Sequence, residues 1–157
     1  MSQSAAPAPL PEALAAIVED FNALGEPDRL QLLLEFSEGL PELPERYSEH
    51  PELLEPVPEC QSPIFLVTEL EGDGGGNGTD AVVRLHFSAP AEAPTTRGFA
   101  GILHEGLDGL TAAEVLAVPD DVSDRLGLSR AITPLRLRGM GGMLARIKRQ
   151  VREKSGA

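Results

Sequence analysis

The chain of 157 residues contains a single cysteine, Cys60, which is the strongest nucleophile available to it. Cys60 stands in the stretch VPECQSPIFLV, residues 57–67, in which the apolar run begins only at Ile64. A cysteine that only fills a core is more naturally found inside such a run. Its position at a loop-to-strand junction raises two interpretations, a reactive thiol and a small buried side chain, and the residues alone leave both open.

The sequence neighbours of Cys60 do not activate it. A thiol attacks as its thiolate, and the carboxylates of Glu55 and Glu59 raise the pKa of a nearby thiol. No lysine or arginine lies between Arg46 and Arg84. Activation of Cys60 must therefore come from a tertiary contact or from a partner protein.

A histidine would make Cys60 part of a different kind of site. Cysteine hydrolases pair the thiol with a histidine base, and His86 lies on the polar face of an expected strand from which it can approach Cys60. A thiol enzyme that uses Cys60 with His86 is therefore an alternative, and an interaction domain with an inert core cysteine is another. The histidines lack metal-ligand spacing, and one cysteine excludes a Cys-rich zinc site, so we expect no metal. One cysteine also excludes an intrachain disulfide.

Charge is distributed unevenly along the chain, whose net charge is −12. Residues 1–135 carry 24 Asp and Glu against 6 Lys and Arg, whereas residues 136–157 carry 7 Lys and Arg against one Glu. An acidic body disfavours nucleic acid, because phosphate contacts supply most of that affinity. With no secretory signal pattern and no apolar run long enough for a membrane span, we expect a cytoplasmic protein without nucleic-acid or membrane partners.

Hydrophobic periodicity predicts helices at both ends of the chain and strands in the middle. Helical spacing follows Pro11 and Pro27, and an acidic, proline-rich connector leads from there to Cys60. Strands are expected over residues 64–70 and 82–88, joined by a glycine-rich hairpin connection. Further helices are expected after Thr95 or Thr96, at the capping box of Thr111 with Glu114, over the stretch PDDVSDRLGL, and after Thr133–Pro134.

This order of elements predicts an α+β fold in which a small antiparallel β-sheet packs against several helices on one side. The last helix should present an apolar stripe of five residues to the core: Leu137, Met140, Leu144, Ile147 and Val151. We expect a disordered lead-in over residues 1–10, one domain over 11–154 and a tail over 155–157.

Four motifs in order give this chain a resemblance to a known family. They are ECQSPIFLV around Cys60, RGFAGIL from Arg97, LGLSRAITPLRLRGMGGMLARI from Leu126, and the opening helices IVEDFNAL and LLLEFSEGLPELPE. Together they resemble the SufE family of sulfur-acceptor proteins in iron–sulfur cluster assembly, over roughly residues 10–152. Two departures stand out: Glu59 replaces a glycine that many members have before the cysteine, and Glu92 lies where the family has an aspartate-rich segment.

The resemblance implies a persulfide carrier. A pyridoxal-phosphate cysteine desulfurase (SufS-like) would pass sulfur to Cys60, which would hand it to a SufBCD-type scaffold and thereby stimulate the desulfurase. The carrier itself would bind no cofactor beyond the transient persulfide on Cys60, and we expect a monomer or a weak homodimer.

Four further residues have candidate supporting roles under this resemblance. Gln61 and Ser62 can donate hydrogen bonds to a thiolate or persulfide, although both also suit ordinary strand-entry positions. Arg97 and Arg136 match family positions and can supply positive charge or dock a partner, although helix-terminal pairing with carboxylates explains them equally.

Overall fold

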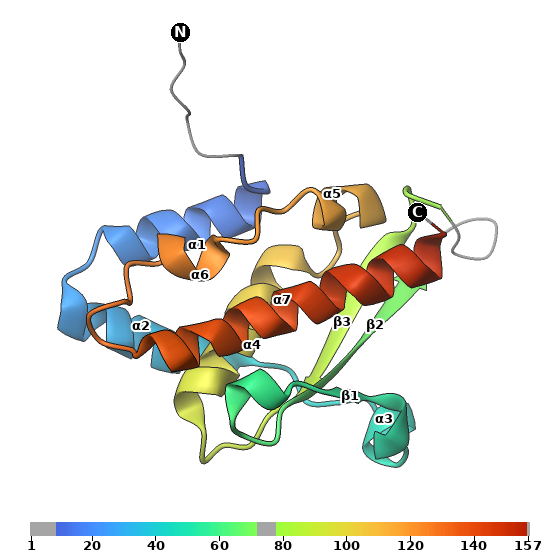
Figure 1. The fold of residues 1–157 in the computed structure, drawn as a ribbon, viewed down its shortest axis with the longest axis horizontal. Helices are drawn as coiled ribbons and strands as arrows, with labels where there is room; N and C mark the ends of the chain where they lie inside the picture. Colours follow the sequence, from blue (N-terminus) through green and yellow to red (C-terminus); the bar gives the residue numbers. More distant parts are fainter. Residues whose placement is uncertain (1–8, 72–77, 157) are drawn as a thin grey trace, which may run out of the picture.

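A three-stranded antiparallel sheet and seven α-helices make up residues 9–71 and 78–156, the part of the chain that the computed structural model describes (Figure 1). The helices are α1 (Glu12–Asn22), α2 (Glu26–Gly39), α3 (Glu45–Ser48), α4 (Pro94–Leu107), α5 (Ala112–Leu116), α6 (Val122–Arg125) and α7 (Pro134–Ser155). The strands are β1 (Glu55–Pro56), β2 (Phe65–Glu71) and β3 (Val82–Ser88), and two 3₁₀ turns are η1 (Pro51–Leu53) and η2 (Pro58–Cys60). The predicted α+β fold with a small antiparallel sheet is confirmed.

The sheet has the order β1-β2-β3, with both pairs antiparallel. The sequence predicts β2 and β3, and the alternating burial of β3 is as expected, with Val83, Leu85 and Phe87 buried. It does not predict β1, which pairs Glu55 with Leu66 of β2. A two-residue edge strand that ends in proline carries too little pattern to be recognised.

The two faces of the sheet have different surroundings. Leu66 and Leu85 belong to the main core, which α4 and α7 cover. On the opposite face, Val67 packs with Tyr47 and Leu54 in a small separate cluster under α3 and η1. The sheet therefore separates the main core from the small cluster of Tyr47, Leu54 and Val67.

Helix α7 runs along most of the long axis of the molecule and carries the predicted stripe into the core (Figure 1). Thr133 caps it by accepting a hydrogen bond from the backbone N–H of Arg136, and Pro134 occupies the first turn. All five stripe residues are buried, as the spacing predicts. The capping box of Thr111 and Glu114 at the start of α5 is also present.

The start of α4 differs from the prediction. The helix begins at Pro94 with Ala93 at its N-cap, so Thr95 and Thr96 lie inside the first turn and neither caps it. Proline suits this position, because its missing N–H would have no helical partner there. The predicted lead-in falls largely on residues 1–8, outside the described residues, and the domain boundaries stay a prediction. Among the described helices, none is both long and apolar enough to cross a membrane.

Helices α2 and α4 pack at backbone distance because α4 presents two glycines to α2. A Cβ atom added at Gly98 would lie 2.6 Å from the Leu33 carbonyl oxygen, and one added at Gly101 would lie 2.2 Å from that of Phe36. Real Cβ atoms do not approach a backbone oxygen so closely, so any side chain at either position forces the helices apart. This contact sets the distance between α2 and α4.

We predict that Gly101→Ala lowers the free energy of unfolding by about 1–3 kcal/mol or more, the usual cost of overpacking. Urea unfolding of the full chain measures it. Gly141→Ala in α7 is the matched control, because no atom lies within 4 Å of its added Cβ. The control should be neutral or slightly stabilising, since alanine favours helix. Equal stability of Gly101→Ala and wild type would contradict the packing argument.

Candidate functional site

Cys60 lies in the loop of a β-hairpin. Strands β1 and β2 pair antiparallel, and residues 57–64 connect them. We call residues 57–64 the Cys60 loop. Its two ends are tied together, because the backbone N–H of Val57 donates to the carbonyl of Ile64 at 2.9 Å and both side chains are buried. Cys60 ends the 3₁₀ turn η2, and Gln61 then adopts a left-handed conformation with φ of 57°. The Cys60 loop is therefore short, and its two ends are held together by the Val57–Ile64 hydrogen bond.

The thiol of Cys60 is packed against helix α7. Its residue is 6% exposed, and its Sγ donates to the Gly139 carbonyl oxygen at 3.5 Å. Gly139 makes this approach feasible, since an added Cβ there would lie 3.0 Å from Sγ and 3.1 Å from the Cα of Cys60. One turn further, Gly142 makes the same room for Glu59, whose Cδ lies 3.0 Å from its added Cβ. The Cys60 loop therefore rests on a glycine-bearing face of α7.

Burial keeps the thiol neutral in this arrangement. Desolvation raises the pKa of Cys60 to about 12, the Glu59 carboxylate adds to the rise, and the Arg146 guanidinium opposes it. The sequence attributes a raised pKa to Glu55 and Glu59; in the structure burial is the larger cause, and Glu59, not Glu55, adds to it. In this position Cys60 is a sheltered thiol and a poor nucleophile near pH 7.

Two carboxylates of the hairpin meet the basic end of α7. Arg146 Nη1 donates to Glu59 Oε2 at 2.8 Å, and Arg146 Nε lies 3.4 Å from Glu55 Oε2. Glu55 also pairs with Arg149 and accepts a hydrogen bond from Gln150 at 2.9 Å. The basic C-terminal segment therefore serves in part to hold the acidic hairpin. Arg146 is the nearby cation that lowers the pKa of Cys60, but burial and Glu59 outweigh it, so this tertiary contact does not activate the thiol.

An open groove of about 630 Å³ adjoins the Cys60 loop. It is lined by Glu59 together with residues of α6, α7 and the segment between them: Ser123, Asp124, Ser129, Pro134, Leu137, Arg138, Gly141, Gly142 and Ala145. The groove gives the loop free space on the side of Glu59.

The remaining predicted site residues are dispersed. Gln61 is exposed and Ser62 half-buried, and among the described residues the sulfur has the Gly139 carbonyl as its hydrogen-bond partner. Arg136 is exposed in the first turn of α7, one turn before Gly139, where its guanidinium has no partner within the described chain. Arg97 instead donates to three backbone carbonyls: those of Ser37 and Leu40 at the end of α2, and that of Ala89 just after β3. Arg97 thus joins α2, β3 and α4, and a role at the thiol is not supported by these contacts.

His86 and Cys60 lie on opposite faces of the sheet. His86 is paired with Val67 in the ladder and alternates with the core residue Leu85, whereas Cys60 belongs to the main core. The imidazole Nε2 lies 2.9 Å from Glu69 Oε1. Burial alone would raise the pKa of Glu69, but hydrogen bonds from Arg46, Tyr47 and His86 outweigh it and lower that pKa to about 2. The structure gives the alternative thiol enzyme no Cys60–His86 pair.

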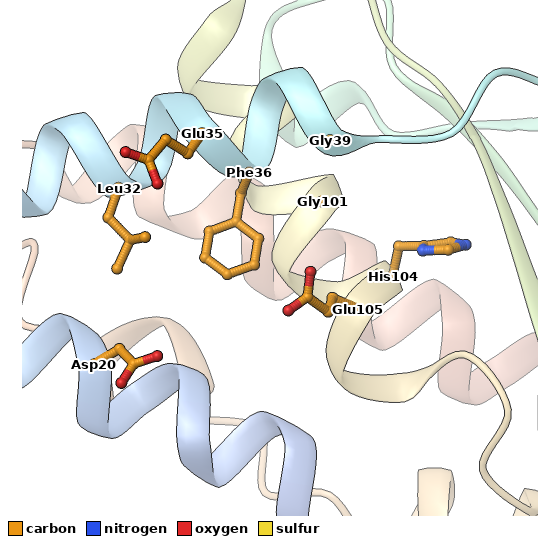
Figure 2. Close-up of a pocket in the computed structure, with 8 residues that line it drawn as sticks. All are labelled: Asp20, Leu32, Glu35, Phe36, Gly39, Gly101, His104 and Glu105. Atoms are coloured by element: carbon orange, nitrogen blue, oxygen red, sulfur yellow. The ribbon is translucent and has the colours of Figure 1, made fainter.

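A second pocket, of about 300 Å³, is lined by α1, α2 and α4 and by no residue of the Cys60 loop or α7 (Figure 2). The Phe36 ring and Leu32 form its apolar part, and the carboxylates of Asp20, Glu35 and Glu105 surround them (Figure 2). None of the residues that line it carries a thiol or a hydroxyl group, and His104 lines it beside the carboxylates. Among the described residues, no three His, Cys, Asp or Glu lie together as a metal site requires. Cys60 is therefore the candidate reactive residue of the described structure.

Sequence reasoning missed the residues on α7 that receive the Cys60 loop. In the sequence, Arg146 is one of several basic residues in a charged segment. Nothing local singles it out, because its partner Glu59 is 87 positions away. The pair Gly139 and Gly142 carried a usable signal, because two glycines three residues apart in a helix often mark a close backbone approach.

The fold and site define a small α+β protein with one thiol sheltered in a hairpin loop. Residues 15–151 match the family described as "SufE: Fe-S metabolism associated domain". An uncharacterized SufE-like protein of Mycobacterium tuberculosis is 56% identical over 148 residues, which cover 94% of this chain and 97% of the relative. A SufE-like protein of Synechocystis is 30% identical over 133 residues, 84% of this chain and 76% of the relative.

A solution structure of a hypothetical protein from Thermus thermophilus superposes with a TM-score of 0.77 at 38% identity, covering 95% of this chain and all of the other. The chain belongs to the SufE family, whose domain is associated with iron–sulfur metabolism.

We predict that iodoacetamide alkylates Cys60 in the folded protein at pH 8 on the order of 10³-fold more slowly than in the urea-unfolded chain, since three pKa units separate about 12 from the ordinary 9. Time-resolved mass spectrometry measures both rates. The folded rate should keep rising with pH beyond pH 9. Equal rates in the two states would contradict the sheltered thiol.

The same pKa shift predicts a loss of stability in alkali. Because the pKa of Cys60 is higher in the fold than in the unfolded chain, its stabilising contribution is complete below pH 9 and disappears as the pH rises toward 12. Comparing urea unfolding of the wild type and Cys60→Ser between pH 8 and 11 measures this. The wild type should lose stability more steeply, and parallel curves would contradict the shift.

Proposed function

We propose that this protein is a sulfur acceptor that takes persulfide sulfur from a pyridoxal-phosphate cysteine desulfurase onto Cys60 and passes it to an iron–sulfur cluster scaffold. The observation that carries the proposal is the placement of the chain's one thiol in a hairpin loop on a fixed base, within a family associated with iron–sulfur metabolism. The alternative with His86 has no geometric support.

The transfer is a thiol exchange in which atoms and electrons balance. The Cys60 thiolate attacks the terminal sulfur of the donor persulfide, a new S–S bond forms on Cys60, and the donor S–S bond breaks. The bonding pair leaves with the donor sulfur as a thiolate, so no external oxidant or reductant is needed. Release of the donor thiolate frees the desulfurase for another turnover, which accounts for stimulation.

A single thiol suits a carrier. A second cysteine nearby would attack the persulfide, form a disulfide and expel the cargo as sulfide. This chain contains no second cysteine, so sulfur on Cys60 can leave only to an outside nucleophile.

Transfer also requires that the Cys60 loop leave α7. The sulfur faces the Gly139 carbonyl and is almost wholly buried, so a donor cannot reach it in the closed position. The base of the loop is held by the Val57–Ile64 hydrogen bond and by the pairing of β1 with β2. Movement of the loop alone, with the sheet intact, would present the thiol to a partner's pocket.

We predict that incubation with cysteine and a cysteine desulfurase under anaerobic, thiol-free conditions adds one reducible sulfur atom to the wild type and none to Cys60→Ser. Intact-protein mass spectrometry before and after reduction measures the adduct. Desulfurase turnover should rise with the wild type and not with Cys60→Ser. His86→Gln is the matched control and should accept sulfur as the wild type does.

Two outcomes would count against the proposal. Absence of any adduct, with desulfurase turnover unchanged, would leave an interaction domain with an inert core thiol. Loss of the adduct in His86→Gln, with the fold intact by circular dichroism, would favour the thiol enzyme instead.

A further inference from the structure

The Cys60 loop is fastened to α7 by contacts of two kinds. Val57, Cys60 and Ile64 are buried and belong to the main core. Near the tip, the charged contact is the ion pair of Glu59 with Arg146, at 2.8 Å. Glu59 immediately precedes Cys60, so any movement that exposes the thiol must also move Glu59.

Arg146 is held in place independently of Glu59. Its Nη1 also donates to the Gly142 carbonyl at 3.2 Å, and its Nε faces Glu55 at 3.4 Å. Glu55 is itself fixed by Arg149 and Gln150 of α7. The base of the hairpin therefore has several polar anchors on α7, whereas the tip has the Glu59–Arg146 ion pair and the longer hydrogen bond of Cys60 Sγ to the Gly139 carbonyl at 3.5 Å.

We propose that Glu59 and Arg146 form a latch that holds the Cys60 loop closed on α7, with Arg146 as a positioning residue that acts on Cys60 through Glu59. This inference deepens the proposed function and rests on it only for the use of the open loop, which is to bring Cys60 to a sulfur donor. The closed loop shelters the thiol, and breaking the one ion pair releases the tip while the hairpin base stays attached.

The exposure of the pair indicates a weak latch. The Glu59 side chain is 43% exposed and that of Arg146 21% exposed, so solvent and salt screen their attraction. A partly exposed ion pair shifts an equilibrium by about two- to fivefold. An effect of that size favours the closed loop at rest and still lets a docking partner open it.

Gly142 supports the same interpretation. The added Cβ at Gly142 would lie 3.0 Å from Cδ and 3.1 Å from Oε2 of Glu59. A side chain at this position would therefore press on the carboxylate that Arg146 binds. The absence of one allows Glu59 to lie flat against the helix.

A competing explanation makes the opposite prediction. If Arg146 acted only as a positive charge near the sulfur, removing it would disfavour the thiolate and slow the reaction of Cys60. If Arg146 acts as a latch, removing it opens the loop and speeds the reaction. Glu59→Gln accelerates the reaction under both explanations, so Arg146→Gln is the diagnostic variant.

The test measures the second-order rate of iodoacetamide with Cys60 in the folded full chain at pH 8. We expect Glu59→Gln and Arg146→Gln each to raise the rate about two- to fivefold, and the double variant to exceed neither by much, because both changes break one contact. Arg146→Lys keeps a cation within reach of Glu59 and should return the rate toward that of the wild type. Salt at about 1 M should speed the wild type more than Glu59→Gln.

Lys148→Gln is the matched control. Lys148 lies on the same helix and pairs with Asp120 at 2.7 Å, away from the Cys60 loop. Its loss should leave the rate of Cys60 unchanged. An equal acceleration in Lys148→Gln would mean general loosening of α7 and would overturn the latch.

Other results would also overturn it. A slower reaction in Arg146→Gln, with the double variant near the wild type, would assign Arg146 to charge compensation alone. Unchanged rates in both single variants would remove any role for the pair. If Arg146→Gln fails to fold by circular dichroism, Arg146→Lys and the salt dependence of Glu59→Gln decide the question.

These outcomes are separate from those of the proposed function. Iodoacetamide needs no desulfurase, so the latch can fail while sulfur transfer to Cys60 is observed. Conversely, a confirmed latch without any sulfur adduct would leave a gated thiol and overturn only its assigned use.

Discussion

Contact between the Cys60 loop and the glycines of α7 governs the chemistry of this protein. Gly139 lets Cys60 approach the helix so closely that an added Cβ would lie 3.0 Å from Sγ, and Gly142 makes the same room for the Glu59 side chain. The approach buries the sulfur, burial keeps it protonated, and protonation makes it unreactive. The resting state of the thiol therefore follows from two missing Cβ atoms on a helix nearly eighty residues away in sequence.

The charge distribution of the chain has a structural use. The C-terminal segment is basic in an otherwise acidic sequence, and its arginines and lysines meet carboxylates of distant segments. Glu55 and Glu59 of the hairpin pair with α7, and so does Asp120. Part of the segment that resembles a basic binding tail in sequence is thus engaged in ion pairs within the molecule.

An element of the fold could be predicted from the sequence where its signal lay in a local pattern of residues. The stripe of α7 and the alternation of β3 repeat with the period of their element, so both could be predicted. Strand β1 could not, because two residues ending in Pro56 show no period. The start of α4 was misplaced because the threonines looked like caps, whereas Pro94 occupies the first turn.

The site was predictable only in part for the same reason. Cys60 was found from its type and its motif, and Glu59 was noticed as a departure from a family pattern. Arg146 was not found, since pairing across 87 positions leaves no trace in either local sequence. The separation of Cys60 from His86 was likewise not predictable, because it depends on the pairing of the strands, which puts the two residues on opposite sides of the sheet.

Oxidative damage is limited by the sheltered, protonated state of Cys60. Peroxide reacts with thiolates, and a sulfur driven past sulfenic to sulfinic acid is ordinarily lost to further chemistry. This chain contains no second cysteine that could take over if Cys60 were oxidised. In the closed loop, a neutral sulfur against the Gly139 carbonyl is protected from peroxide and from mixed disulfides with small cellular thiols. The fold that withholds the nucleophile thus also prolongs the working life of each copy of the protein.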